Sequence, residues 1–190
     1  MGKVIAGMAM SLDGFVNDDT GSVDKLYTDF IKLHDVPSFL DMIKNTGVVV
    51  MGRHVYEMAD PFEWATDEYE FHTPIYVLTH TPPVKYPQGN GKLSFIFVRD
   101  GIQSAISQAT KAAGDKDVQV LGANTIQQCV NAGLCDELQI GVMPVLIGKG
   151  LRLFEHIDTE KIQLVRTKVE ELTSQRTSMT FRVEKVAENN

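Results

Sequence analysis

The sequence predicts an α/β fold: one mixed, mainly parallel sheet flanked by helices on both faces, with an antiparallel hairpin at the C-terminal end. Short apolar runs such as residues 48–51 (Val-Val-Val-Met) are typical of strands that are buried on both faces. These runs alternate with segments of helical periodicity, as in residues 102–112. Near the end, residues 162–169 and 177–186 alternate apolar and polar residues around a turn at 170–176, which indicates an antiparallel hairpin.

Each remaining element follows from periodicity and turn chemistry. The other strands are expected at residues 4–10, 75–79, 95–98, 118–121 and 138–142. Helices are expected over apolar positions from 26 to 33, after Pro37 until Gly47 stops the helix, over 102–112 until Gly114, and over 126–132 until Gly133. Residues 122–125 are expected to form the turn before the last of these helices.

Composition narrows the classes of function. The 190 residues fit a single domain over residues 1–187, with a flexible tail at 188–190. A formal charge of −7 argues against a surface for nucleic acid or an acidic membrane. No run approaches the roughly 18 to 20 apolar residues that span a bilayer, and the N-terminus resembles a strand rather than a leader. We therefore expect a cytoplasmic protein that acts on a small molecule.

Cysteine and histidine usage gives no sign of a metal site. Cys129 and Cys135 form no second pair and are interpreted as small buried hydrophobic residues. The five histidines are scattered without the one-turn spacing of a helical metal site. The sequence therefore predicts no metal dependence and no disulfide.

A candidate phosphate site follows the second predicted strand. Ligands of mainly parallel sheets sit at the carboxyl ends of the strands, where Ser11 to Gly14, Gly52-Arg53 and Gly122-Ala123 all fall. Gly52 allows a tight turn and Arg53 offers a bidentate donor that suits a phosphate such as the 2′-phosphate of NADPH. The alternative is that Arg53 is a solvated surface charge.

Four motifs in order extend the argument along most of the chain: Val4 to Gly14 (VIAGMAMSLDG), Val50 to Glu57 (VMGRHVYE), Val120 to Asn124 (VLGAN), and Asp136-Glu137-Leu138 leading to Pro144 to Gly150 (PVLIGKG). With these motifs the chain resembles the dihydrofolate reductase-like superfamily, and within it the RibD C-terminal-domain family. The resemblance implies an NADPH-dependent reductase that forms a homodimer.

The resemblance also implies a cofactor site. It places Gly52, Arg53 and His54 near the adenosine phosphates, and Thr79 and His80 beside the 2′-phosphate and adenine. It places Ala6 and Gly7 against the nicotinamide carboxamide, and it assigns the pyrophosphate to the backbone of Leu121, Gly122, Ala123, Asn124, Thr125 and Ile126. The family usually has two glycines where this chain has Gly122-Ala123. A positive φ angle at Ala123 would be costly and would alter cofactor binding.

The substrate is less well defined by the sequence. Dihydrofolate reductases carry an acid on the first helix, but the matching position here is near Phe39. Asp13 is the best candidate for orienting or protonating a substrate, and the alternative is that its side chain bonds its own turn. The acidic, aromatic segment from Asp60 to Trp64 suits a neutral substrate, and its aromatic rings, with Tyr56, are expected to be mainly core.

The sequence therefore predicts reduction of a small, heterocyclic or otherwise unsaturated C=N or C=O compound, with the proton supplied by Asp13 or by water. The methionines at 8, 10, 51 and 58 are expected to fill the core, and His72 is expected to be exposed. Two alternatives remain. One is a dinucleotide-binding protein without catalysis, and the other is a true dihydrofolate or pteridine reductase, which the missing acid disfavours.

Overall fold

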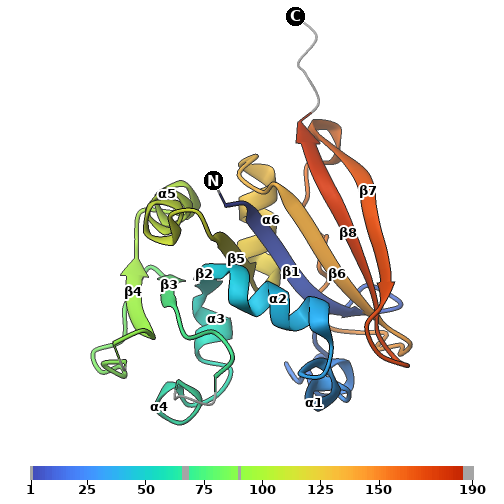
Figure 1. Cartoon of the computed structure of the whole chain (residues 1–190), viewed down its shortest axis with the longest axis horizontal. Coiled ribbons are helices and arrows are strands. Elements are labelled where there is room, and N and C mark those ends of the chain that lie inside the picture. Colours follow the sequence, from blue (N-terminus) through green and yellow to red (C-terminus); the bar gives the residue numbers. More distant parts are fainter. Residues whose placement is uncertain (1, 66–68, 90, 186–190) are drawn as a thin grey trace, which may run out of the picture.

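The computed structural model describes residues 2–65, 69–89 and 91–185 and confirms the predicted α/β architecture (Figure 1). The strands are β1 (Val4–Ser11), β2 (Thr46–Gly52), β3 (Pro74–Leu78), β4 (Ser94–Val98), β5 (Asp117–Leu121), β6 (Glu137–Met143), β7 (Ile162–Glu171) and β8 (Thr177–Lys185). Within the described residues they form one sheet in the order β4-β3-β2-β5-β1-β6-β8-β7. The pairs from β4 to β6 are parallel, and β8 and β7 add antiparallel strands at the edge.

Helices cover both faces of this sheet, as predicted. Helices α5 (Ile102–Ala113) and α6 (Ala123–Asn131) pack on one face, and α2 (Pro37–Asn45) lies on the other, in front of the sheet in Figure 1. The remaining helical segments are short: η1 (Asp24–Leu26), α1 (Phe30–Leu33), α3 (Arg53–Tyr56), α4 (Pro61–Trp64) and η2 (Thr159–Lys161).

The two faces of the sheet are packed differently. On the face of α5 and α6, the side chains of all the central strands join one continuous cluster, which includes Ala6, Val50 and Val120. On the face of α2 the buried residues form two separate clusters, one around Met51 and one around Ala9. Burial of apolar surface on both faces is the main stabilising term of such a fold.

Three boundary predictions were wrong. The helix expected over residues 26–33 is divided into η1 and the four-residue α1. Gly47 does not stop α2 but lies inside β2, where an added β-carbon would come within 2.8 Å of Lys116 Cβ. Finally, α6 starts at Ala123 directly after Gly122, so residues 123–125 of the expected turn are already helical.

The aromatic and histidine predictions had mixed outcomes. Tyr56 is 2% exposed and belongs to the core, as expected, whereas Phe62 is 57% exposed on α4. The side chain of Trp64 lies outside the described residues. His72 is exposed, as predicted.

Among the methionines, Met51 is buried and Met8 and Met10 pack partly into the core, but Met58 is 59% exposed, so its core assignment was wrong. Cys129 and Cys135 are both buried and free, which confirms the interpretation of these residues.

Two further features concern the described residues only. None of their helices combines the length and the apolar character that crossing a bilayer requires. No group of three or more histidine, cysteine, aspartate or glutamate side chains within them is arranged to hold a metal ion.

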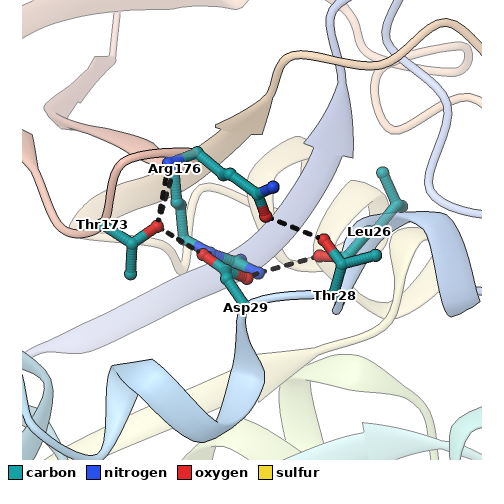
Figure 2. Close-up of polar contacts among 6 residues, drawn as sticks. Leu26, Thr28, Asp29, Thr173 and Arg176 are labelled. Atoms are coloured by element: carbon teal, nitrogen blue, oxygen red, sulfur yellow. Dashed lines mark hydrogen bonds and ion pairs between the residues drawn. The ribbon is translucent and has the colours of Figure 1, made fainter.

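A buried ion pair ties the C-terminal hairpin to the segment between β1 and α2 (Figure 2). Arg176, in the turn between β7 and β8, donates from Nη2 to Asp29 Oδ1 (2.7 Å) and from Nε to Asp29 Oδ2 (3.1 Å). Arg176 Nη2 also donates to the carbonyl of Leu26 (2.8 Å), and Thr173 Oγ1 donates to Asp29 Oδ2 (2.7 Å). Both charged residues are almost fully buried, so the pair is a strong long-range constraint on this end of the sheet.

Candidate functional site

A cavity of about 740 Å³ opens at the carboxyl ends of β2, β3, β4 and β5. Its volume lies within the usual range for cofactor and ligand sites. Nine of the thirteen residues predicted from the sequence to contact the cofactor line it: Gly52, Arg53, His54, Thr79, His80, Gly122, Ala123, Asn124 and Thr125. The structure thus brings together predicted residues that are up to 73 positions apart in the chain, from Gly52 to Thr125.

The strand-to-helix connection after β2 supplies one cationic corner. Arg53 is half-exposed and its Nε donates to Glu57 Oε1 at 2.8 Å, one helical turn away. The Nη groups of Arg53 have no partner among the described residues and remain available to a phosphate. Gly52 has φ −80°, an angle that any residue can adopt, so its conformation does not require glycine. Glycine is needed instead because Thr125 packs closely against it: an added β-carbon would lie 2.7 Å from Thr125 Oγ1. Since α3 has only four residues, the guanidinium rather than a helix dipole makes this corner attractive to anions.

The ends of β3 and β4 supply a second polar corner. Thr79 is buried, and its hydroxyl donates to Thr81 O (3.1 Å) and accepts from Thr81 N (3.2 Å), which fixes the turn beneath the exposed His80. Arg99 directly follows β4 and also lines the cavity. Arg99 was not predicted from the sequence, although it carries the same signal as Arg53: a cation immediately after an apolar run that forms a parallel strand.

The turn between β5 and α6 forms the middle of the cavity. Gly122 has φ +90°, and an added β-carbon would lie 2.6 Å from Val55 Cγ2, so only glycine fits there. Ala123 is the first residue of α6 and packs into the core, so the positive φ does not fall on it and the strain that we anticipated at Ala123 is absent.

Two of the predicted residues around this turn, Leu121 and Ile126, do not have side chains that line the cavity. Leu121 packs in the core on the α2 face, and Ile126 is fully buried on the opposite face. The Ile126 N–H donates to Gly122 O (2.9 Å) inside α6, so it is not available to a pyrophosphate. The N–H groups of Ala123, Asn124 and Thr125 lie in the first turn of this nine-residue helix, where backbone donors lack intrahelical partners.

The far end of the cavity is apolar and reaches the first strand. Met8, Val16, Val23 and Leu151 line this end, together with Asn17 and Gly21 from the same loop as Val16 and Val23. Ala6 and Gly7 are not among the lining residues: the side chain of Ala6 is fully buried on the face of α5 and α6, and Gly7 is the neighbour of Met8. The cavity therefore reaches β1 at Met8, one residue after the predicted contacts Ala6 and Gly7.

Asp13 lies outside this cavity, in the turn that follows β1. Its carboxylate accepts from Ser11 Oγ (2.6 Å), from Gly148 N (2.7 Å) and from Ile147 N (3.1 Å). The hydroxyl of Ser11 and these two backbone N–H groups lower the pKa of Asp13 to about 2, against the opposing effect of desolvation. Asp13 therefore stays ionised near neutral pH, which disfavours it as a proton donor. Its hydrogen bonds point to a structural role that joins the turn after β1 to the backbone at Ile147 and Gly148, which is wider than the predicted bonding within its own turn.

We expect Asp13→Asn to lower the thermal unfolding temperature at pH 6 to 7 because the charge-assisted hydrogen bonds are weakened. A group with a lowered folded-state pKa stabilises the fold above its unfolded pKa of about 4 and loses that effect as the pH falls towards about 2. The difference between the variant and the wild type should therefore shrink between pH 5 and pH 2.5, as thermal melts can measure. A difference at pH 2.5 as large as the one at pH 6 would contradict this structural role.

Comparison with solved structures places the fold. A putative riboflavin biosynthesis protein from Shewanella sp. PV-4 is 26% identical, with a TM-score of 0.73, and the match covers 96% of this chain and 99% of that one. Dihydrofolate reductase from Enterococcus faecalis, complexed with NADP(H), is 15% identical with a TM-score of 0.60 over 95% of this chain and 96% of its own. The structure is therefore a dihydrofolate reductase-like domain.

Comparison with protein families identifies the group to which the chain belongs. The model of the RibD C-terminal domain matches residues 2–178, so the protein is a member of the RibD C-terminal-domain family. A Bacillus subtilis relative, the uncharacterized protein YyaP, is 27% identical over 157 residues, which is 80% of either chain. These findings confirm the family that the four motifs indicated.

Proposed function

We propose that the protein is an NADPH-dependent reductase of a small, neutral heterocycle or of a similar compound with a C=N or C=O bond. The observation that carries this proposal is the polarity of the cavity. Two arginines, Arg53 and Arg99, lie at one end, the Gly122 turn lies in the middle, and Met8 and Val16 lie at the other end. An anionic phosphate suits the first end and a planar nicotinamide suits the last.

The residues present fit the cofactor. Arg53, His54, Thr79, His80 and Arg99 would hold the adenosine phosphates, and the backbone of residues 122–125 would receive the pyrophosphate, because Gly122 has no side chain to block the approach. When bound, NADPH supplies the hydride. Two proteins of the same fold support this choice. The dihydrofolate reductase from Enterococcus faecalis is complexed with NADP(H), and a protein from Thermotoga maritima, of which the match covers 56%, is a diaminohydroxyphosphoribosylaminopyrimidine deaminase/5-amino-6-(5-phosphoribosylamino)uracil reductase.

The protein's own contribution to the reaction is positioning. The cavity wall would orient the nicotinamide against the substrate and exclude water from the reacting atoms. Since the lowered pKa of Asp13 disfavours it as an acid, water is the proton source that this proposal retains. Isothermal calorimetry with NADPH, followed by loss of reduced-nicotinamide absorbance with pterins, pyrimidines, quinones and imines, tests the proposal. Tight binding without turnover would favour a non-catalytic dinucleotide-binding protein.

Arg99→Gln is expected to weaken NADPH binding about tenfold, which is the loss of about 1.5 kcal/mol for one charge-assisted hydrogen bond to phosphate. The affinity for NADH should change little, because NADH lacks the 2′-phosphate. Arg166→Gln is the matched control, since Arg166 is exposed on β7 at the opposite edge of the sheet. An equal loss of affinity for NADPH and NADH would show that Arg99 does not bind the 2′-phosphate.

We also propose a homodimer, which the family resemblance implies. The apolar segment at residues 142–153 is only partly used inside the protomer: Met143 and Leu153 are buried, whereas Leu146 is 69% exposed and Leu12, on the neighbouring turn, is 67% exposed. Sedimentation at micromolar concentration is expected to give twice the 21.1 kDa chain mass. A species of 21.1 kDa alone would refute the dimer.

A further inference from the structure

Gln119 is a polar residue at a position that an apolar side chain would normally fill. It lies in the middle of β5 and is 2% exposed, and its neighbours Val118 and Val120 belong to the core on the face of α5 and α6. The side chain of Gln119 therefore points to the opposite face, where α2 lies.

The amide nitrogen of Gln119 has no hydrogen-bond partner among the described residues. Such a buried donor destabilises a protein and calls for an explanation, because nearly all buried polar atoms in folded proteins are paired. Gln127 shows the usual arrangement in this chain: it is also buried, and its Nε2 donates to the carbonyls of Leu153 (2.9 Å) and Arg152 (3.2 Å).

Gln119 lies where the central strands separate. Strand β1 pairs with β5 only from Val4 to Ala6, whereas it follows β6 as far as Ser11. Beyond Ala6, therefore, β1 and β5 share no further backbone pairs, and the exit turn of β5 at Gly122 and the side chain of Met8 both line the cavity. Beyond Ala6, the edge of β1 that faces β5 makes no backbone pairs with it. A ligand ring that enters between Met8 and Gly122 would reach this unpaired edge.

The residue at this edge is Gly7, and it connects the cavity to Gln119. A β-carbon at Gly7 would lie 3.4 Å from Gln119 Oε1, so the oxygen side of the carboxamide faces the bare backbone of Gly7. A half-turn of the terminal amide torsion exchanges Oε1 and Nε2 and would present the unpaired donor to that place. Neither Gly7 nor Gln119 lines the cavity, but Gly7 is partly buried and adjoins Met8, which does. Met8 packs on the face of α5 and α6, so a ring would have to pass the edge of β1 to reach the side of Gly7 that faces Gln119. A planar group placed on Gly7 would come within reach of the Gln119 amide without displacing any side chain of β1.

We propose that Gln119 recognises the nicotinamide ring, by donating a hydrogen bond from Nε2 to the carboxamide oxygen of the bound cofactor. The inference rests on the proposed function, which supplies a dinucleotide whose planar end occupies the apolar end of the cavity. A neutral carbonyl acceptor fits because the unpaired group is a neutral donor and no charged partner is required. The hydrogen bond would fix the orientation of the ring for hydride transfer.

The test compares NADP with 2′-phospho-ADP-ribose, which has the same phosphates and adenosine but no nicotinamide. Calorimetry on Gln119→Met is expected to give an affinity for NADP about fivefold or more below that of the wild type, as for the loss of one hydrogen bond to a neutral acceptor. The affinity for 2′-phospho-ADP-ribose should stay within about twofold. Unchanged binding of both nucleotides, or equal weakening of both, would overturn the inference.

Thermal melts of the free protein separate this role from a structural one. Gln119→Met removes an unpaired donor and is expected to leave the unfolding temperature unchanged or higher, whereas Gln127→Met breaks two hydrogen bonds and is expected to lower it. A Gln119 variant that melts as low as the Gln127 variant would show an unrecognised structural partner and refute the inference. Failure of the wild-type protein to bind either nucleotide would instead refute the proposed function, so the two failures are distinguishable.

Discussion

Asp29→Ala is expected to lower the free energy of unfolding by about 3–5 kcal/mol, because it leaves the charge of Arg176 buried and unpaired. For a chain of this size such a loss corresponds to a fall of about 10 °C or more in the unfolding temperature. The guanidinium of Arg176 would lose two of its three hydrogen bonds and keep the one to the carbonyl of Leu26 (Figure 2). Chemical denaturation monitored by circular dichroism measures the change.

Two comparisons make this prediction specific. Glu184→Ala breaks the exposed ion pair with Arg182 (2.6 Å) and is expected to cost less than about 1 kcal/mol, because solvent screens that pair. The double variant Asp29→Leu, Arg176→Met replaces the buried charges with apolar groups and should recover most of the lost stability. If the double variant were as unstable as Asp29→Ala, the buried charge would not be the cause.

The pair should also respond to acid. Burial by itself would raise the pKa of Asp29, but the hydrogen bonds from Arg176 and Thr173 outweigh burial and lower it. The ion pair therefore stabilises the fold above the unfolded pKa of about 4, and its contribution is lost as the pH falls further. The stability gap between the wild type and Asp29→Ala should narrow under those conditions.

Gly122→Ala is expected to weaken NADPH binding at least tenfold and to destabilise the protein by about 1–3 kcal/mol. The backbone at Gly122 has φ +90° and ψ 131°, a conformation that is nearly restricted to glycine, and the new methyl group would lie 2.6 Å from Val55 Cγ2. The turn must move, and it carries the backbone N–H groups that we assign to the pyrophosphate. Calorimetry with NADPH and thermal melts give the two quantities.

Gly114→Ala is the matched control for the backbone effect. Gly114 ends α5 at φ +64° and has open space around the position of a β-carbon, so the same substitution there should cost stability without changing NADPH affinity. Adding Val55→Ala to Gly122→Ala removes the close contact and should restore part of the stability. NADPH binding by Gly122→Ala at the wild-type affinity would contradict the role of this turn.

The strand ends were predictable because their signals are local. Gly52-Arg53 and Gly122 each follow an apolar run, and the rule that ligands bind at the carboxyl ends of parallel strands placed them in one region of the sheet. The family resemblance added Thr79 and His80, which also line the cavity. The same local pattern is present at Arg99. Its proximity to His80 was not evident, however, because the sequence alone does not reveal that β4 pairs with β3.

Features that depend on distant contacts were not predictable. Asp29 and Arg176 are 147 residues apart, and neither carries a local signal that it is buried. Gln119 interrupts an apolar strand, but only the separation of β1 from β5 reveals what the carboxamide faces. Asp13 lay in a recognisable turn, yet the backbone donors that lower its pKa come from residues 147 and 148, more than 130 positions away.

The central claim is that one phosphorylated dinucleotide spans this cavity, and a crystal structure with bound NADP tests it most directly. The account predicts the 2′-phosphate within hydrogen-bond distance of Arg99, the pyrophosphate against the backbone of residues 122–125, and the nicotinamide beside Met8 and Gly7. NADP bound outside the cavity, or a cavity that stays empty at saturating NADP, would contradict it.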